Sequence, residues 1–222
     1  MILVIENSES EPLGEIAMKN LFASVVFTAS CAFSVSGFTA TIFVDQFDSE
    51  GSNSVLNYNS FSNWSVLGGS VDLIASGGYG ISCFGETGSC VDLDGTSSNA
   101  GVLTTNESFY LTPGEYTLSF GLSGNQRTSV RDSVTVSLGS TYSEVITLSG
   151  DDPFELFVRN IAVTDATIAS ISFDHAGGDN YGLILDEVSL AAVPIPASGI
   201  LFLSSLLAFL GLRQKQGRAK SA

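Results

Sequence analysis

Short runs of alternating apolar and polar residues are the feature that most limits what this chain can fold into. The clearest run is 115–122, in which every second residue is leucine or aromatic and the residues between are small or polar. Such a period of two places the large side chains on one face of a half-buried strand. A proline-glycine turn at Pro113 and Gly114 precedes the run. No stretch of useful length has the period of an amphipathic helix, so an all-β domain is expected.

The same pattern recurs through the middle of the chain, with turn residues between the runs. The expected strands are 41–44, 64–67, 70–74, 90–93, 101–104, 108–111, 115–122, 133–138, 142–148, 154–163, 169–173 and 183–190. Many short strands at close spacing predict an antiparallel β-sandwich, with a jelly roll as its expected form. A β-helix is the main alternative, but the chain shows no fixed internal period, which a solenoid requires. Trp64, the only tryptophan, is expected in the core, with a ligand platform as the alternative.

The last thirty residues form a three-part segment. Its first part, Val193-Pro194-Ile195-Pro196-Ala197, holds two prolines that cannot lie inside a helix or a central strand, so the domain is expected to stop at about Ala192. Residues 198–212 carry no charge and are apolar on every helical face. Four cations follow at once: Arg213, Lys215, Arg218 and Lys220. A short transmembrane helix over 198–212 and a basic cytoplasmic tail over 213–222 are predicted, and a buried terminal helix is the alternative.

Residues 18–36 predict an export signal at the other end. One lysine precedes about a dozen mostly apolar residues, and small residues before Gly37 suit cleavage after Ser36. Residues 1–17 carry four glutamates where such a signal needs positive charge. Translation is therefore expected to start at Met18, with a disordered extension over 1–17 as the alternative. A lipidated Cys31 is a further alternative, disfavoured because Thr28 stands where a lipoprotein signal prefers leucine.

The charge of residues 37–192 limits the partners of this β-sandwich domain. The range holds 19 acidic residues, three arginines and no lysine. Nucleic-acid phosphates need clustered lysine and arginine, so nucleic-acid binding is excluded. The composition suits an exported protein that binds neutral ligands or divalent cations.

Two cysteines remain once the export signal is removed. Cys83 and Cys90 bracket a six-residue loop with two glycines, and in an oxidising compartment this spacing predicts a disulfide. His175, the only histidine, is expected to be an exposed loop residue and not a zinc ligand. Asp92 to Gly95 resembles the opening of a calcium loop but lacks its later ligands, so it is expected to be a strand entering a turn.

The C-terminal segment resembles the PEP-CTERM sorting signals of Gram-negative bacteria, in the variant Val-Pro-x-Pro-Ala. The order of motif, apolar run and basic end carries the resemblance. It implies a protein that enters the Sec-type export route, is anchored in the inner membrane, and is processed by an exosortase, a membrane protease. Such proteins go to the cell surface or matrix of species that make exopolysaccharide. The chain departs from the commonest form because it lacks glutamate between the prolines, and because Gln214, Gln216 and Gly217 interrupt the basic end.

The middle of the chain is similar to that of many PEP-CTERM proteins and to galactose-binding-like jelly rolls, which include many carbohydrate-binding modules. The similar segments are 61–66, 69–74, 90–95, 111–120 and 183–190. The resemblance implies carbohydrate binding, together with a structural calcium ion near the first and last strands. Asp48, Glu50 and Asp186 are the candidate calcium ligands, and solvated acidic positions are the alternative.

Tyrosines in polar or glycine-rich loops are the expected sugar-binding residues, namely Tyr58, Tyr79 and Tyr181. No nucleophile elbow, zinc-protease helix or phosphate-binding glycine loop occurs, so no catalysis is expected. The sequence therefore favours an exported cell-surface or matrix protein that binds exopolysaccharide. A structural matrix or adhesion protein without a sugar site is the competing hypothesis, and a secreted glycoside hydrolase is the third.

Overall fold

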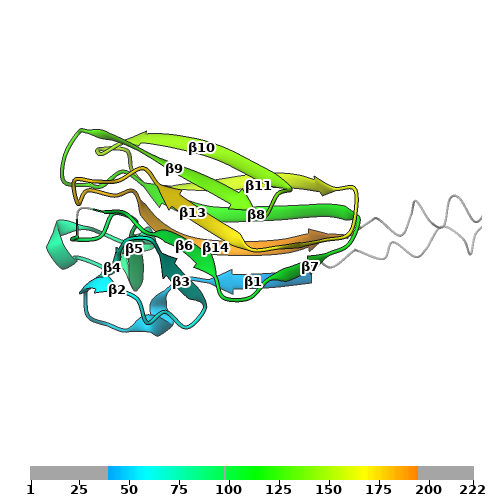
Figure 1. Ribbon diagram of the computed structural model, residues 1–222. Coiled ribbons are helices and arrows are strands. Elements are labelled where there is room, and N and C mark those ends of the chain that lie inside the picture. The colour runs from blue at the N-terminus through cyan, green and yellow to red at the C-terminus, as the bar shows by residue number, and fades with distance from the viewer. Residues whose placement is uncertain (1–39, 98, 195–222) are drawn as a thin grey trace, which may run out of the picture. The chain divides into compact units, whose positions relative to one another are not determined.

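A computed structural model describes residues 40–97 and 99–194, and the regular structure of this part of the chain consists of antiparallel strands and short 3-10 helices (Figure 1). The predicted export signal, the apolar run, the basic tail and residues 195–197 of the proline motif lie outside the described residues. Within the described ranges, no helix has the length and apolar character needed to cross a membrane.

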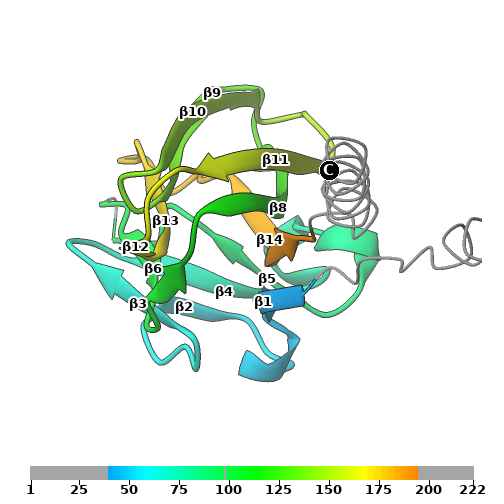
Figure 2. The ribbon, with the colours of Figure 1, turned by 90° about the vertical axis from the view of Figure 1, so that its right-hand side faces the viewer.

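The larger sheet has seven strands. Their order is β11 (Glu155–Val163), β8 (Gly114–Ser123), β14 (Ile184–Val193), β5 (Ser89–Asp92), β4 (Val71–Ala75) and β2 (Val55–Tyr58), and β1 (Ala40–Asp45) also pairs with β14. One edge of β14 pairs with β8, while β5 and β1 share its other edge. Figure 2 looks from the end of the sheet where β1 begins and β14 stops. β14 extends through Val193, one residue past the expected end of the domain.

The second sheet has five strands. Their order is β10 (Tyr142–Ser149), β9 (Arg131–Leu138), β13 (Ile171–His175), β6 (Val102–Thr105) and β3 (Trp64–Leu67). A separate two-stranded ladder joins β7 (Phe109–Leu111) to β12 (Thr167–Ala169). The antiparallel sandwich predicted from the alternating runs is therefore confirmed.

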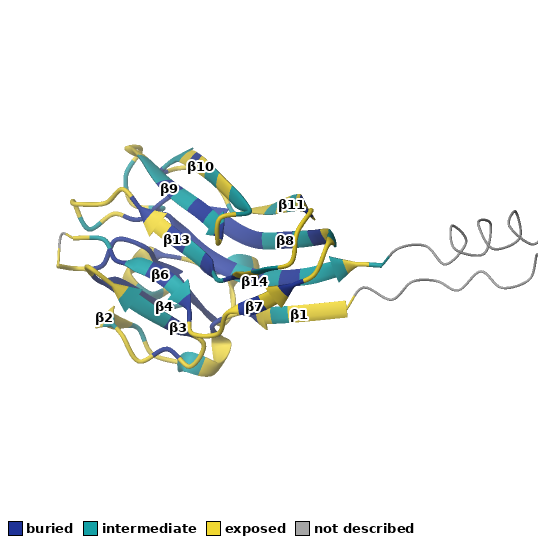
Figure 3. Cartoon of the chain, turned by 45° about the vertical axis from the view of Figure 1, so that its right-hand side comes forward, coloured by how far each residue is buried: buried dark blue, intermediate teal, exposed yellow. Residues whose placement is uncertain are grey.

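The core lies between the two sheets and is rich in aromatic rings. Phe120 of β8 and Phe173 of β13 meet edge to face with their ring centres 5.5 Å apart, so the core joins the sheets directly. Trp64 is 1% exposed, which confirms its predicted core position. Figure 3 shows buried and intermediate residues alternating along parts of β8 and β9, whereas most of β1 is exposed.

A smaller apolar cluster joins β4, β5 and the start of β14 to the segment after β4. It consists of Ile74, Ile81, Cys83, Cys90 and Ile184, with Phe154 packed against it. Residues 76–88 contain the one-turn 3-10 helices η2 (Gly78–Gly80) and η3 (Phe84–Glu86), and η1 (Asp48–Glu50) follows β1. The predicted disulfide between Cys83 and Cys90 is present, and it ties this segment to β5.

Candidate functional site

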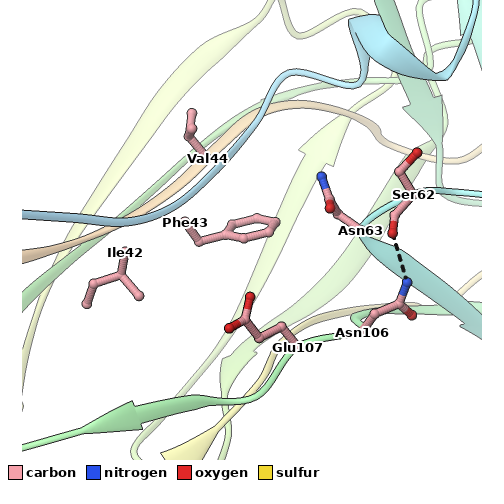
Figure 4. A pocket seen from close by; sticks show the side chains of 7 residues that line it. All are labelled: Ile42, Phe43, Val44, Ser62, Asn63, Asn106 and Glu107. Carbon is pink, nitrogen blue, oxygen red and sulfur yellow. Dashed lines mark hydrogen bonds between the residues drawn. The ribbon is translucent and has the colours of Figure 1, made fainter.

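The candidate site is a hollow of about 410 Å³ along β1, which we call the β1 hollow (Figure 4). Three segments contribute to it: β1, the residues just before β3, and the connection from β6 to β7. Its lining residues are Ile42, Phe43, Val44, Ser62, Asn63, Asn106 and Glu107. The hollow thus lies between β1 of the larger sheet and the segments that precede β3 and follow β6 of the five-stranded sheet.

An aromatic ring of β1 forms the apolar part of the hollow. Figure 4 shows the ring of Phe43 pointing from β1 toward Asn63. Core aromatics hold this ring, because its centre lies 5.5 Å from that of Trp64 and 5.5 Å from that of Phe109. Its neighbours Ile42 and Val44 are 38% and 59% exposed. The hollow therefore presents a supported aromatic ring between two solvent-exposed aliphatic side chains.

A buried carboxylate fixes the wall opposite Phe43. Asp45 is 6% exposed, and its Oδ2 accepts hydrogen bonds from Asn63 Nδ2 at 3.0 Å and from Trp64 Nε1 at 2.9 Å. Its Oδ1 accepts from the backbone N–H of Phe47 at 2.8 Å. Asn63 is therefore held in place, while no described residue donates a hydrogen bond to its side-chain oxygen.

Asn106, on the connection from β6 to β7, is held by hydrogen bonds to the segment before β3. The backbone N–H of Asn106 donates to the carbonyl of Asn63 at 2.9 Å, and its Nδ2 donates to the carbonyl of Ser62 at 3.2 Å. Ser65 Oγ donates to Asn106 Oδ1 at 2.5 Å. The next residue, Glu107, is exposed, and its carboxylate has no hydrogen-bond or ion-pair partner among the described residues.

A second polar cluster lies where β5 leaves the sheet, and we call Asp92, Asp94, Arg127 and His175 the loop clamp. Asp94 is fully buried, and its Oδ2 accepts three backbone N–H bonds, from Gly178 at 2.7 Å and from Asp179 and Asn180 at 3.0 Å each. A carboxylate that accepts hydrogen bonds from several backbone N–H groups fixes the conformation of the backbone around it. The loop after β13 is therefore built around Asp94.

The other members of the loop clamp complete this arrangement. Asp92 accepts hydrogen bonds from Arg127 at 2.5 Å and from the N–H of Gly182 at 2.9 Å. Burial raises the pKa of Asp92 to about 7, although Arg127 acts in the opposite direction. The sequence-based expectation of an exposed His175 is wrong, because this residue ends β13, is 5% exposed, and accepts from the N–H of Leu183 at 3.1 Å.

The three candidate tyrosines lie in separate segments and none of them lines the β1 hollow. Tyr58 in β2 lies next to it, because its hydroxyl donates to Glu50 and the other Glu50 oxygen accepts from the N–H of Ser62. Tyr79 in η2 is 57% exposed. Tyr181 is 37% exposed, with the guanidinium of Arg127 4.7 Å from its ring centre. Their sugar-binding role stays a prediction.

The three candidate calcium ligands are each engaged by protein N–H groups. Asp48 accepts from Ser89 at 2.8 Å, Glu50 accepts from Ser62 at 2.8 Å, and Asp186 accepts from Phe84 at 3.1 Å. Burial raises the pKa of Asp186 to about 7. Within 40–97 and 99–194, no group of three or more histidine, cysteine, aspartate or glutamate residues is arranged to hold a metal ion. A calcium ion thus stays a prediction.

No protein-family model and no curated protein matches this chain. Among solved structures, the CBM22-1 and GH10 modules of a Clostridium thermocellum endo-1,4-β-D-xylanase complexed with xylohexaose match at 18% identity and a TM-score of 0.44. That match covers 71% of this chain and 29% of the xylanase chain. The K1 cleaved adhesin domain of Lys-gingipain from Porphyromonas gingivalis matches at 16% identity and a TM-score of 0.45, over 71% of this chain and 100% of the adhesin chain. These similarities carry no functional argument.

Proposed function

We propose that this protein is a non-catalytic carbohydrate-binding protein, and that the β1 hollow is its sugar site. The observation that carries the proposal is the position of the Phe43 ring beside Asn63, Asn106 and Glu107 in one hollow. Ligand sites of this kind combine an apolar or aromatic surface with a few placed polar groups. A sugar ring matches both features, because its C–H face can pack on an aromatic ring while its hydroxyls bond to amide and carboxylate groups.

The construction of the hollow supports the same proposal. Asp45 and the core aromatics hold Asn63 and Phe43 in place before any ligand binds. Binding then costs little ordering of the protein, and preorganisation of this kind raises affinity. The volume of about 410 Å³ falls within the range of small-ligand sites, roughly 300 to 1,000 Å³.

The proposal includes a location at the cell surface, which the sequence supports. An export signal at 18–36, the motif beginning at Val193 and the basic end resemble a sorting system that delivers proteins to the cell surface. We propose export through the inner membrane, transient anchoring over 198–212 and processing by an exosortase-type protease. The jelly-roll-like sandwich would then bind glycans of the exopolysaccharide layer.

Retention of the purified full chain on exopolysaccharide from the host tests the sugar site. We expect Phe43→Ala to reduce retention by about tenfold, because Phe43 is the aromatic residue among those that line the hollow. Glu155→Gln, on the distant strand β11, is the matched control and is expected to leave retention unchanged. Melting temperatures verify that each variant is folded. Equal retention of a folded Phe43→Ala variant and the unchanged protein would contradict the proposal.

A further inference from the structure

We propose that the β1 hollow takes an amino sugar whose nitrogen carries a free, positively charged ammonium group, so that the glycan ligand is cationic. This inference rests on the proposed carbohydrate-binding function and names the chemical class of its ligand. Three observations carry it: the carboxylate of Glu107, which has no partner among the described residues, the ring of Phe43 in the same hollow, and the charge of the whole domain.

Glu107 is the carboxylate that the hollow leaves available. The two nearby carboxylates are already engaged, since Asp45 accepts three hydrogen bonds and Glu50 accepts one from Ser62 and one from Tyr58. Glu107 has no such partner among the described residues and is exposed. A carboxylate forms its strongest hydrogen bonds with charged donors, so an ammonium group is a better partner for Glu107 than a hydroxyl group.

The aromatic ring favours the same charge. A cation that packs on the face of a phenyl ring is attracted by the negative potential of the π-system. Phe43 and Glu107 line one hollow, so an ammonium group bound there can approach the ring and the carboxylate together. An anionic sugar would be disfavoured at both positions.

The net negative charge of the domain also favours a cationic glycan over an anionic one as the polymer approaches the surface. Residues 37–192 hold 19 acidic residues and three arginines, and two of these arginines are already paired with carboxylates. Arg127 is bonded to Asp92 and Arg159 to Glu144. A surface of one sign attracts a polymer of the opposite sign and repels one of the same sign. Uronate, sulfate and phosphate glycans are therefore poor candidates, and a partly de-N-acetylated polymer is a good one.

The test uses two oligosaccharides with the same backbone, chitopentaose with free amines and its fully N-acetylated form. The full chain is titrated with each by calorimetry in mildly acidic, low-salt buffer, where the amines are protonated. We expect the amine form to bind about tenfold more tightly, since charge pairing and cation–π contact each add a modest gain. Glu107→Gln is expected to reduce the ratio of the two affinities to less than about twofold.

Glu155→Gln is the matched control, because it removes the same charge from β11, which β8 and β14 separate from β1. An equal loss of preference in both variants would show that only the overall charge acts, and would overturn the local site. Equal binding of the two oligosaccharides by the unchanged protein would overturn the ligand class and leave the sugar site standing. No binding of these oligosaccharides or of host exopolysaccharide would overturn both proposals. Displacement of bound glycan by an acidic oligosaccharide would also contradict the inference.

Discussion

The β1 hollow and the loop clamp both contain carboxylates, but Glu107 of the hollow and Asp94 of the loop clamp are placed in opposite ways. In the loop clamp, Asp94 is fully buried and one of its oxygens accepts three backbone N–H bonds. In the β1 hollow, Glu107 is exposed and its carboxylate has no partner among the described residues. Polar groups that are bonded internally hold the loop in place, whereas those that are open to solvent are available to a ligand.

The loop clamp therefore contributes to the stability of the fold, and the β1 hollow to ligand binding. The aromatic rings of the two regions differ in the same way. The ring of Tyr181 lies against Arg127 of the loop clamp, whereas core rings hold Phe43 so that it lines the hollow. Changes in the loop clamp should therefore lower stability and leave glycan affinity unchanged in the folded protein. In the β1 hollow, Glu107→Gln should do the reverse, whereas Phe43→Ala should lower both affinity and stability because its ring packs on Trp64 and Phe109.

The largest expected effect on stability is that of Asp94→Ala. Three backbone N–H groups lose their acceptor, and each such loss costs about 1 to 3 kcal/mol when the group is buried and less when it is part-exposed, as these groups are. Because the opened loop can recover some bonds to water, we expect the free energy of unfolding to fall by about 3 kcal/mol. Urea denaturation measures this free energy of unfolding. The control is Glu107→Ala, which is expected to lower it by less than about 0.5 kcal/mol. Similar costs for the two variants would remove the distinction between the regions.

Loss of the disulfide is expected to have the next largest effect. The double variant Cys83→Ser and Cys90→Ser frees the segment after β4, which should reduce the free energy of unfolding by about 2 to 3 kcal/mol. A reducing agent should lower the melting temperature of the unchanged protein and not that of the variant. Glycan affinity should stay the same, because neither cysteine lines the hollow. A weakened affinity in the folded variant would show that the two regions are coupled.

The pH dependence of stability should reveal the buried Asp186. Its pKa is raised from 3.8 to about 7, so the folded protein retains this proton over a range in which the unfolded chain has lost it. The stabilisation is fully present below about pH 4 and is lost as the pH rises through about 7, with a slope of at most about 1.4 kcal/mol per pH unit. Asp186→Asn should flatten the slope in denaturation measured between these pH values. An unchanged slope would contradict this assignment.

The smallest expected effects on binding come from the tyrosines outside the hollow. Tyr79→Ala and Tyr181→Ala should each change glycan affinity by less than about twofold, the change expected when no direct contact is lost. Tyr181→Ala should also cost about 0.5 kcal/mol of stability through the lost contact with Arg127. Calorimetry and denaturation of the same samples measure both quantities. A loss of affinity above about tenfold in either variant would favour the sequence-based tyrosine hypothesis.

The strands could be predicted because the period of two is a local signal. Every expected strand overlaps a strand of the structure, and β8 matches its run closely. β2 was missed because this edge strand is mostly exposed and carries no alternation, with a left-handed backbone at Asn57. The expected strand 169–173 is split between β12 and β13 at Ser170, because the chain changes ladders there without glycine or proline.

The candidate site could not be predicted in the same way. Phe43, Asn63 and Glu107 come from three segments, and only the tertiary structure brings them together. Loop composition indicated tyrosines instead, since loop position was the available signal. His175 was misjudged for a related reason, because the glycine-rich sequence after it indicated a loop, whereas its own position at the end of β13 is buried.

The most direct test is a nuclear magnetic resonance titration of the full chain with oligosaccharides cut from host exopolysaccharide. The side-chain amides of Asn63 and Asn106 report on the β1 hollow, and those of Asn125 and the backbone amides of 178–180 report on the region of the loop clamp. We predict saturable shifts at Asn63, Asn106 and the backbone of 42–44, with none at the loop clamp. Shifts confined to 176–183, or no shift at any position, would contradict the assignment of the β1 hollow as the sugar site.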